Sequence, residues 1–327
     1  MEVNPGAAEP RRVEELWFEE GGLIIRAQAC LFRVPRGILA ARSPIFADML
    51  SCPQPPDSEA LDGCPVVEIP DAAADVTVFL KAIFDSSFFE AYPHTTNFAT
   101  VSAILRLSAK YEVEHLRRRA LTHLSSRFPT TLSDWDVRAD DEGPLWRRSS
   151  WHDDISEYIC IATIQLCREI HAPWILPSAF YMFCSENPAP QVILHGTQAP
   201  HVELGDHDKA VFFAGQLLQH GTETKDVGRF LYFPSTIDTC VTPKRCGKAR
   251  LAALEGFWNN YQEFPSMPLD IWDENDWDDL GICSICRGVL EKIHQEAREA
   301  CWDRLPGVYG LPSRKDLEAM KKTAGVL

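Results

Sequence analysis

Residues 32–50, FRVPRGILAARSPIFADML, decide the fold that the sequence predicts for the N-terminal half of the chain. Phe32 and Val34 are two residues apart, which is the spacing of side chains on one face of a β-strand. The later apolar residues recur at helical spacing, and Ser43 with Pro44 is a typical pair of N-cap and first-turn residues. The stretch therefore predicts a strand followed by two short helices.

The segments on either side extend this pattern. Residues 16–28 contain two apolar runs interrupted by two glycines, and together with the strand that follows they predict a β-hairpin. Residues 64–71, CPVVEIPD, predict a short strand ended by proline, and residues 73–85 predict a helix. Residues 98–128 carry apolar side chains at helical spacing in two blocks, which predicts a helix pair.

Residues 32–50 resemble the core of a BTB/POZ domain, in which an extended segment and a basic residue precede the pattern L-A-x-R-S-x-x-F-x-x-M. The resemblance covers about residues 10–128 and implies an α+β domain that self-associates. Pro35 departs from the pattern, because the family commonly has histidine there and proline has no N–H for a strand partner. The matching residues are Phe32, Val34, Arg36, Leu39, Ala40, Arg42, Ser43, Phe46 and Met49.

Self-association is also expected from the apolar character of the hairpin and the first helix. A partner related by two-fold symmetry would cover this surface and would make each contact twice. Arg42 is expected to be a buried charge with an acidic partner. Alternatively these side chains fill the core of one copy, an interpretation that is at least as well supported for Ile38 and Phe46. The residues predicted for the interface are Leu16, Phe18, Ile38, Arg42, Ile45, Phe46 and Met49.

The second half of the chain has a different composition. Residues 129–150 are polar and contain a Gly-Pro pair, so they are expected to form a linker. Residues 151–327 hold several amphipathic stretches and are predicted to form a mostly α-helical domain. This half resembles the helical C-terminal half of BTB-domain proteins of mushroom-forming fungi. The overall prediction is an α+β protein with an N-terminal BTB/POZ-like domain followed by a helical domain.

Two close cysteine pairs stand out among the eleven cysteines of the chain. Cys240 and Cys246 form a C-x5-C pair, and Cys283 and Cys286 form a C-x2-C pair. Zn²⁺ prefers four thiolates in a tetrahedron, so the two pairs together predict a structural zinc site. Unligated core thiols and a redox-active C-x2-C pair are the alternatives. His294 and Cys301 are substitute ligands by residue type, but each stands alone at helical spacing and is assigned to the surface or the core.

An acidic segment, DIWDENDWDDL, lies between the two cysteine pairs. A calcium loop starting at Asp273 is excluded, because Asp278 and Ser284 stand where the loop needs glycine and glutamate. We interpret the segment as a solvated acidic stretch that Trp272 and Trp277 attach to the helical core. A docking site for a basic partner is the alternative.

Charge and composition exclude several classes of protein. The 327 residues include 32 basic and 47 acidic side chains, a net charge of −15, and no basic patch appears, so direct nucleic-acid binding is not expected. Residues 1–15 lack an apolar signal region, and no run of eighteen apolar residues occurs, so neither secretion nor membrane insertion is expected. The expected location is intracellular, in the cytoplasm or the nucleus.

No common enzyme motif is found. The chain has no G-x-S-x-G, H-E-x-x-H or G-x-G-x-x-G pattern, and Gly247-Lys248 does not complete a phosphate-binding loop. Cys167 and His171 have the spacing of a nucleophile and base on one helix, but Cys167 adjoins an apolar stripe and is interpreted as a core thiol. The leading hypothesis is a non-enzymatic interaction protein that associates with itself and with unidentified protein partners. A cysteine- or metal-dependent enzyme in the helical half is the alternative from a different class.

A further alternative, implied by the resemblance alone, is a substrate receptor for a cullin-type ubiquitin ligase. Cullin-binding domains of this kind usually present a hydrophobic-x-Glu motif in the loop that corresponds to residues 51–65. In that loop Glu59 is the only glutamate, and Asp57 stands two residues before it in place of an apolar residue. An apolar anchor normally dominates the binding energy of such a patch, so a cullin partner is not favoured.

Overall fold

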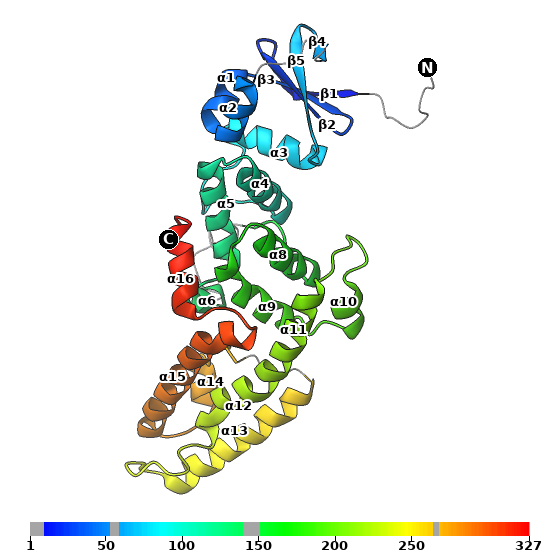
Figure 1. The fold of residues 1–327 in the computed structure, drawn as a ribbon. Helices are drawn as coiled ribbons and strands as arrows, with labels where there is room; N and C mark the ends of the chain where they lie inside the picture. Colours follow the sequence, from blue (N-terminus) through cyan, green and yellow to red (C-terminus); the bar gives the residue numbers. More distant parts are fainter. Residues whose placement is uncertain (1–9, 53–58, 140–150, 264–267, 327) are drawn as a thin grey trace. The chain divides into compact units, whose positions relative to one another are not determined.

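The protein is described from a computed structural model, which describes residues 10–52, 59–139, 151–263 and 268–326 (Figure 1). The fold is α+β, with a small five-stranded sheet in the N-terminal part followed by helices. The described residues form two compact units, the first from those within 1–127, 142–154 and 324–327 and the second from those within 128–141 and 155–323. Each unit has its own buried core and is described by itself.

The sheet of the first unit has the strand order β1-β3-β2-β5-β4. Strands β2 and β3 form the predicted antiparallel hairpin, with Leu23 opposite Val34. β5 runs parallel to β2, and β1 runs parallel to β3. β3 ends immediately before Pro35, whose carbonyl instead accepts the N–H of Leu39 at 3.2 Å. The strands are β1 (Arg11–Trp17), β2 (Leu23–Ala27), β3 (Cys30–Val34), β4 (Ala60–Leu61) and β5 (Cys64–Ile69).

The two predicted short helices, α1 (Arg36–Arg42) and α2 (Pro44–Ser51), are confirmed. Ser43 separates them because its side chain accepts the backbone N–H of Phe46 at 3.1 Å and caps α2. The same hydroxyl donates to the carbonyl of Tyr111 at 2.5 Å, and Phe46 stacks on the Tyr111 ring with centroids 4.5 Å apart. Ser43 is fully buried, so this junction fastens the helix pair to the core.

Three longer helices complete the first unit: α3 (Ala73–Phe84), α4 (Phe98–Lys110) and α5 (Glu114–Arg127). The predicted break within residues 98–128 occurs at Glu112, which has a positive φ of 53°. The apolar stripe predicted for the second helix of this pair is confirmed, since Leu116, Ala120, Leu124 and Phe128 are all fully buried. Helical spacing therefore located both helices and their buried faces.

The second unit is built from helices. Its core includes Phe180, which stacks on Tyr309 with ring centroids 5.0 Å apart, and Phe183, which contacts Phe212 at 4.6 Å. The α-helices are α6 (Leu132–Ala139), α8 (Glu157–Glu169), α9 (Leu176–Ser185), α10 (Pro190–His195), α11 (Asp206–Leu218), α12 (Thr224–Val227), α13 (Pro243–Glu263), α14 (Glu274–Asp279), α15 (Ser284–Val308) and α16 (Arg314–Thr323). Shorter turns are η1 (Pro173–Ile175), the π-helical η2 (Gln219–Glu223) and η3 (Gly228–Leu231).

Helix α6 lies within the range 129–150 that the sequence analysis predicts to be a linker. Trp135 of α6 is buried and meets the ring of Tyr181 edge-on at 5.0 Å. Asp136 of α6 pairs with the buried Arg298 of α15. A single buried aromatic and one ion pair thus anchor a helix whose polar composition resembles that of a linker. Residues 140–150 of the predicted linker lie outside the described residues.

Within the described part of the chain, no helix combines the length and the apolar character needed to cross a membrane.

Candidate metal centre

The four cysteines of the two predicted pairs lie together in the second unit. Their Sγ atoms are all within 4.8 Å of one another. Four sulfurs about 2.3 Å from a tetrahedral zinc ion are about 3.8 Å apart, and the Sγ atoms of Cys240 and Cys283 are 3.8 Å apart. All four cysteines are free thiols. The arrangement is therefore compatible with a metal site, as the spacing of the pairs predicts.

The N-terminal ends of α13 and α15 bring the four sulfurs together. Cys283 is the N-cap residue of α15 and Cys286 lies in its first turn, so both sulfurs are at the same end of that helix. Cys246 lies in the first turn of α13, and its N–H donates to the carbonyl of Thr242 at 2.9 Å. Cys240 lies in the loop just before α13. Helix N-termini stabilise negative charge, so both positions favour thiolates.

Hydrogen bonds connect the two pairs even without an ion. The backbone N–H of Cys283 donates to Sγ of Cys246 at 3.3 Å, across 37 residues of sequence. The hydroxyl of Thr242 lies 3.1 Å from the same sulfur. Donors of this kind orient a thiolate and stabilise part of its negative charge. This is the usual role of the groups that surround metal ligands.

The pKa values of the four thiols separate them into two kinds. The backbone N–H of Cys286 is the largest influence on Cys283 and lowers the pKa of its thiol to about 6. Burial raises the pKa of Cys246, but hydrogen bonds from Thr242 and the backbone of Cys283 outweigh it and make the net shift downward. Burial raises the pKa of Cys240 and of Cys286. Four adjacent thiolates would repel one another, and a bound cation would remove that repulsion.

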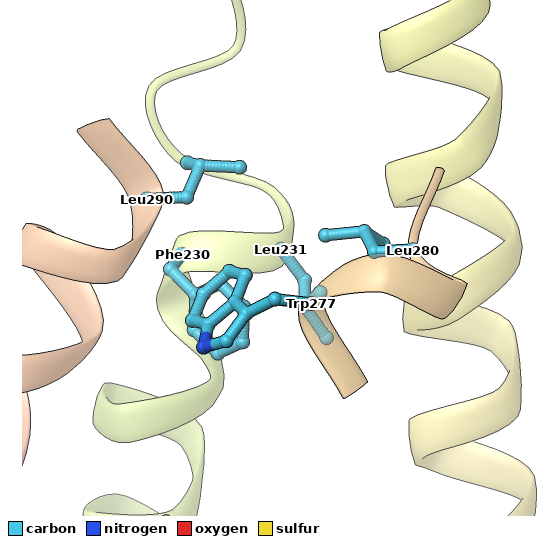
Figure 2. Close-up of a cluster of buried hydrophobic side chains, with 5 residues drawn as sticks. All are labelled: Phe230, Leu231, Trp277, Leu280 and Leu290. Carbon is cyan, nitrogen blue, oxygen red and sulfur yellow. The ribbon is translucent and has the colours of Figure 1, made fainter. Parts of the chain in front are cut away.

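A hydrophobic cluster adjoins the four cysteines along the chain (Figure 2). Ile237, three residues before Cys240, and Ile282, directly before Cys283, pack against it. Figure 2 shows the rings of Phe230 and Trp277 next to each other, and their centroids are 5.3 Å apart. The buried members of the cluster are Phe230, Leu231, Trp277, Leu280 and Leu290. A metal that joined the starts of α13 and α15 would thus stabilise one end of this cluster.

The tryptophans of the acidic segment behave as the sequence analysis predicts. Trp277 is buried in the cluster and Trp272 packs against it, with ring centroids 5.0 Å apart. The short helix α14 within the segment was missed. Its signal is a capping box, in which Asp273 accepts the N–H of Asp276 at 2.9 Å and Asp276 accepts the N–H of Asp273 at 2.9 Å.

The substitute ligands considered from the sequence do not join the cluster. Among the described residues, the metal-like group consists of the four cysteines alone. Cys301 and His294 are buried in the core, as one of the two interpretations held. Cys167 is also buried, and burial raises the pKa of its thiol, so it is a core thiol as interpreted.

The residues predicted for self-association have different environments. Leu16 and Phe46 are buried in the core of the first unit, while Phe18 and Met49 are half-buried. Phe18 contacts the ring of Phe84 at 5.4 Å. Among the predicted residues, the exposed apolar side chains are Ile38 and Ile45, at 48% and 37% exposure.

Arg42, which is expected to be a buried charge of the self-association interface, is exposed in a single copy of the chain. Arg42 is the last residue of α1. A cation at the C-terminal end of a helix interacts favourably with the helix dipole, so the guanidinium is accommodated in solvent without an acidic partner in the core.

A scan against protein-family models, a search of curated proteins and a search of solved structures find no match for the chain. The fold and the site therefore define its class by their own features. It is an α+β protein whose helical unit contains a cluster of four cysteines compatible with a metal site.

Proposed function

We propose that the protein is a non-enzymatic interaction protein, which self-associates through a BTB/POZ-like N-terminal unit and carries a structural zinc ion in its helical unit. The observation that carries self-association is the exposure of Ile38 and Ile45 on α1 and α2. Removing apolar side chains from water on association is favourable and roughly proportional to the area covered. A second copy of the chain is the proposed occupant of this surface.

The order of elements supports a BTB/POZ-like unit. A strand hairpin is followed by a pair of short helices, a strand that pairs parallel with β2, and three longer helices. The residues that carry the resemblance occupy consistent places: Leu39 and Phe46 are buried, and Ser43 caps the second short helix. The proposal therefore agrees with the resemblance in both sequence and element order.

Light scattering of the full chain tests the self-association. At micromolar concentration the wild-type chain should have twice the 36.8 kDa mass of one copy. The double variant Ile38→Glu/Ile45→Glu should dissociate at least about tenfold more readily, because interface energy is concentrated in a few apolar anchors. Phe88→Glu is the matched control, since Phe88 is an equally exposed apolar residue of the same unit outside α1 and α2. A monomeric wild-type chain would overturn the proposal.

For the metal, Zn²⁺ suits the donor set, because four thiolates are its usual structural ligands. Four protein ligands leave no open coordination position, so the ion would be structural. Its effect would be to close the chain between Cys240 and Cys286 and to hold the starts of α13 and α15 together.

Elemental analysis of protein purified without chelator should find about one zinc per chain. A thiol reagent added to the native protein should react with the exposed Cys52 and spare the four clustered cysteines. Absence of zinc together with free titration of the four thiols would refute the zinc site and favour unligated core thiols.

The alternative functions have less support. In the loop considered for cullin binding, Glu59 is engaged within the chain by Arg26, with one guanidinium nitrogen 2.8 Å from its carboxylate. Asp57 lies outside the described residues. A metal enzyme in the helical half would need an open metal position and a general base, and a closed set of four thiolates offers neither.

A further inference from the structure

A second feature of the helical unit is a cavity of about 260 Å³ between η3, α13, α14 and α15. It is lined by side chains that the zinc proposal does not use. Pockets for drug-sized ligands usually have volumes of about 300–1,000 Å³. The cavity therefore fits a small head group or the end of one side chain.

Aromatic rings form much of its wall. Phe230 and Trp272 meet edge-to-face with centroids 4.8 Å apart, and Phe230 lies 4.9 Å from the ring of His294. Phe257 of α13 also lines the cavity. Aromatic faces carry partial negative charge, so such a wall attracts cations as well as apolar groups.

His294 supplies a buried polar group at the cavity wall. Its side chain is 5% exposed. Burial, followed by the charge of Arg298, lowers the pKa of His294 to about 4 against a smaller opposing influence of the Val227 backbone. The neutral ring thus presents one acceptor nitrogen at neutral pH.

The charges at the cavity favour a positively charged ligand. Asp270 and Asp276 line it, and among the described residues no lysine or arginine does. The chain as a whole carries a net charge of −15. Anionic ligands would be repelled by the two carboxylates and by the net charge of the chain, while a cation would be attracted to the mouth of the cavity.

We propose that this cavity binds an organic ammonium group, with the rings of Phe230, Phe257 and Trp272 around its alkyl substituents and the carboxylates of Asp270 and Asp276 near its charge. The same chemistry is available from a small alkylammonium compound and from a methylated lysine side chain of a protein. The site requires no metal ion. A failure of this proposal and a failure of the zinc proposal can therefore be distinguished.

Calorimetric titration of the full-length protein with choline tests the charge requirement, with 3,3-dimethylbutan-1-ol as the neutral compound of the same shape. Cation–π attraction and the two carboxylates act only on choline, so choline should bind about tenfold more tightly. Equal affinity for the two compounds, or no saturable binding of choline, would overturn the proposal.

Variants at the cavity test its location. Asp270→Asn should weaken choline binding by about fivefold, the worth of one partly solvated charge pair. Asp279→Asn is the matched control, because Asp279 is an exposed residue of the same acidic segment that does not line the cavity. Trp272→Leu keeps an apolar side chain but removes the ring, and should weaken binding of choline more than that of the neutral alcohol. Equal effects of Asp270→Asn and Asp279→Asn would contradict the assignment.

A peptide that contains trimethyllysine distinguishes the two sources of the ammonium group. If the peptide binds more tightly than choline, and more tightly than the same peptide with unmodified lysine, the source is a protein side chain. If choline binds more tightly than the peptide, the source is a small compound. Both results support an ammonium site, while binding of the unmodified peptide with equal affinity to the methylated one would contradict recognition by the aromatic rings. The zinc content, measured on the same samples, shows whether the outcome depends on the metal site.

Discussion

Arg298 shows how a single buried charge can organise the helical unit. Its side chain is fully buried, and one guanidinium nitrogen donates to the carbonyl of Leu269 at 2.8 Å. It also pairs with Asp136 of α6, so one residue connects three segments that are distant in sequence. Such a group is tolerated because each of its nitrogens has a partner.

We predict that Arg298→Met destabilises the protein by about 3 kcal/mol, because it leaves Asp136 and the Leu269 carbonyl without their partner. Urea unfolding followed by circular dichroism would measure the change. Lys292→Met is the control on the same helix, since Lys292 is exposed and pairs loosely with Glu296 at 3.8 Å. Its effect should stay within about 0.5 kcal/mol. Equal destabilisation by the two variants would contradict the role assigned to Arg298.

The second prediction at this scale concerns His294 and pH. Burial lowers the pKa of His294 from 6.5 to about 4. Below pH 6.5 the unfolded chain binds a proton that the folded chain does not, so stability is full above that pH and falls as the pH decreases toward 4. Between pH 7 and pH 5 the loss from this residue should be roughly 2 kcal/mol.

Urea unfolding of wild type and His294→Phe at the two pH values tests this prediction. The variant should lose that part of the pH dependence, because it cannot be protonated. His207→Phe, which replaces an exposed histidine of α11, should retain it. An unchanged pH dependence in His294→Phe would show that other groups are responsible.

At the scale of elements, the four cysteines determine how α13 and α15 meet. Each helix begins at one cysteine pair, and in the described chain the N–H of Cys283 contacts Sγ of Cys246. Beyond their starts, side chains of both helices pack in the same hydrophobic cluster, among them Phe257 of α13 and Leu290 of α15. A zinc ion would replace the thiol contacts by four metal–sulfur bonds and would transmit its stability to the adjacent aromatic cluster.

We therefore predict that Cys286→Ser lowers the zinc content from about one ion per chain to about zero and costs about 4 kcal/mol or more of unfolding free energy, as loss of a structural metal usually does. Elemental analysis and thermal unfolding would measure the two effects. Cys52→Ser is the matched control, because Cys52 is exposed and lies in the other unit. Retention of zinc by Cys286→Ser would remove this residue from the ligand set.

At the scale of the whole molecule, the chain consists of two units with separate cores, and the proposed metal belongs to one of them. A metal that closes one segment stabilises that segment first, since binding is coupled to the folding of the parts it joins. Perturbing the metal should therefore affect the two units differently.

Hydrogen exchange with and without a chelator tests this expectation. Removal of the ion should increase exchange in the starts of α13 and α15 and in the cluster around Trp277. Strands β2 and β3 and helices α4 and α5 should keep their protection. Uniform loss of protection in both units, or no change in either, would contradict a local structural role for the metal.

The sequence alone was sufficient for features that depend on residues near each other in the chain. The hairpin, the two short helices at Ser43 and the buried stripe of α5 follow from side-chain spacing and from capping, which are local properties. The two cysteine pairs were also visible, because the residue types and the short spacing within each pair are typical of zinc ligands. Helix α6 was missed because its polar composition concealed the buried Trp135, and the short α14 was missed because the capping box of Asp273 and Asp276 was not recognised.

Other features required the tertiary structure, because they depend on which distant segments meet. The partnership of Arg298 with Asp136 and the aromatic cavity around His294 each join residues far apart in the sequence, whereas the meeting of the two cysteine pairs was predicted from their residue types. The sequence also did not show which apolar side chains are exposed. Ile38 and Phe46 have similar local patterns, yet Ile38 is exposed and Phe46 is in the core. Burial is decided by packing between elements, and periodicity specifies an apolar face without specifying what covers it. For this protein the sequence therefore determined its elements and candidate ligands, while tertiary packing decided which side chains meet and which remain exposed.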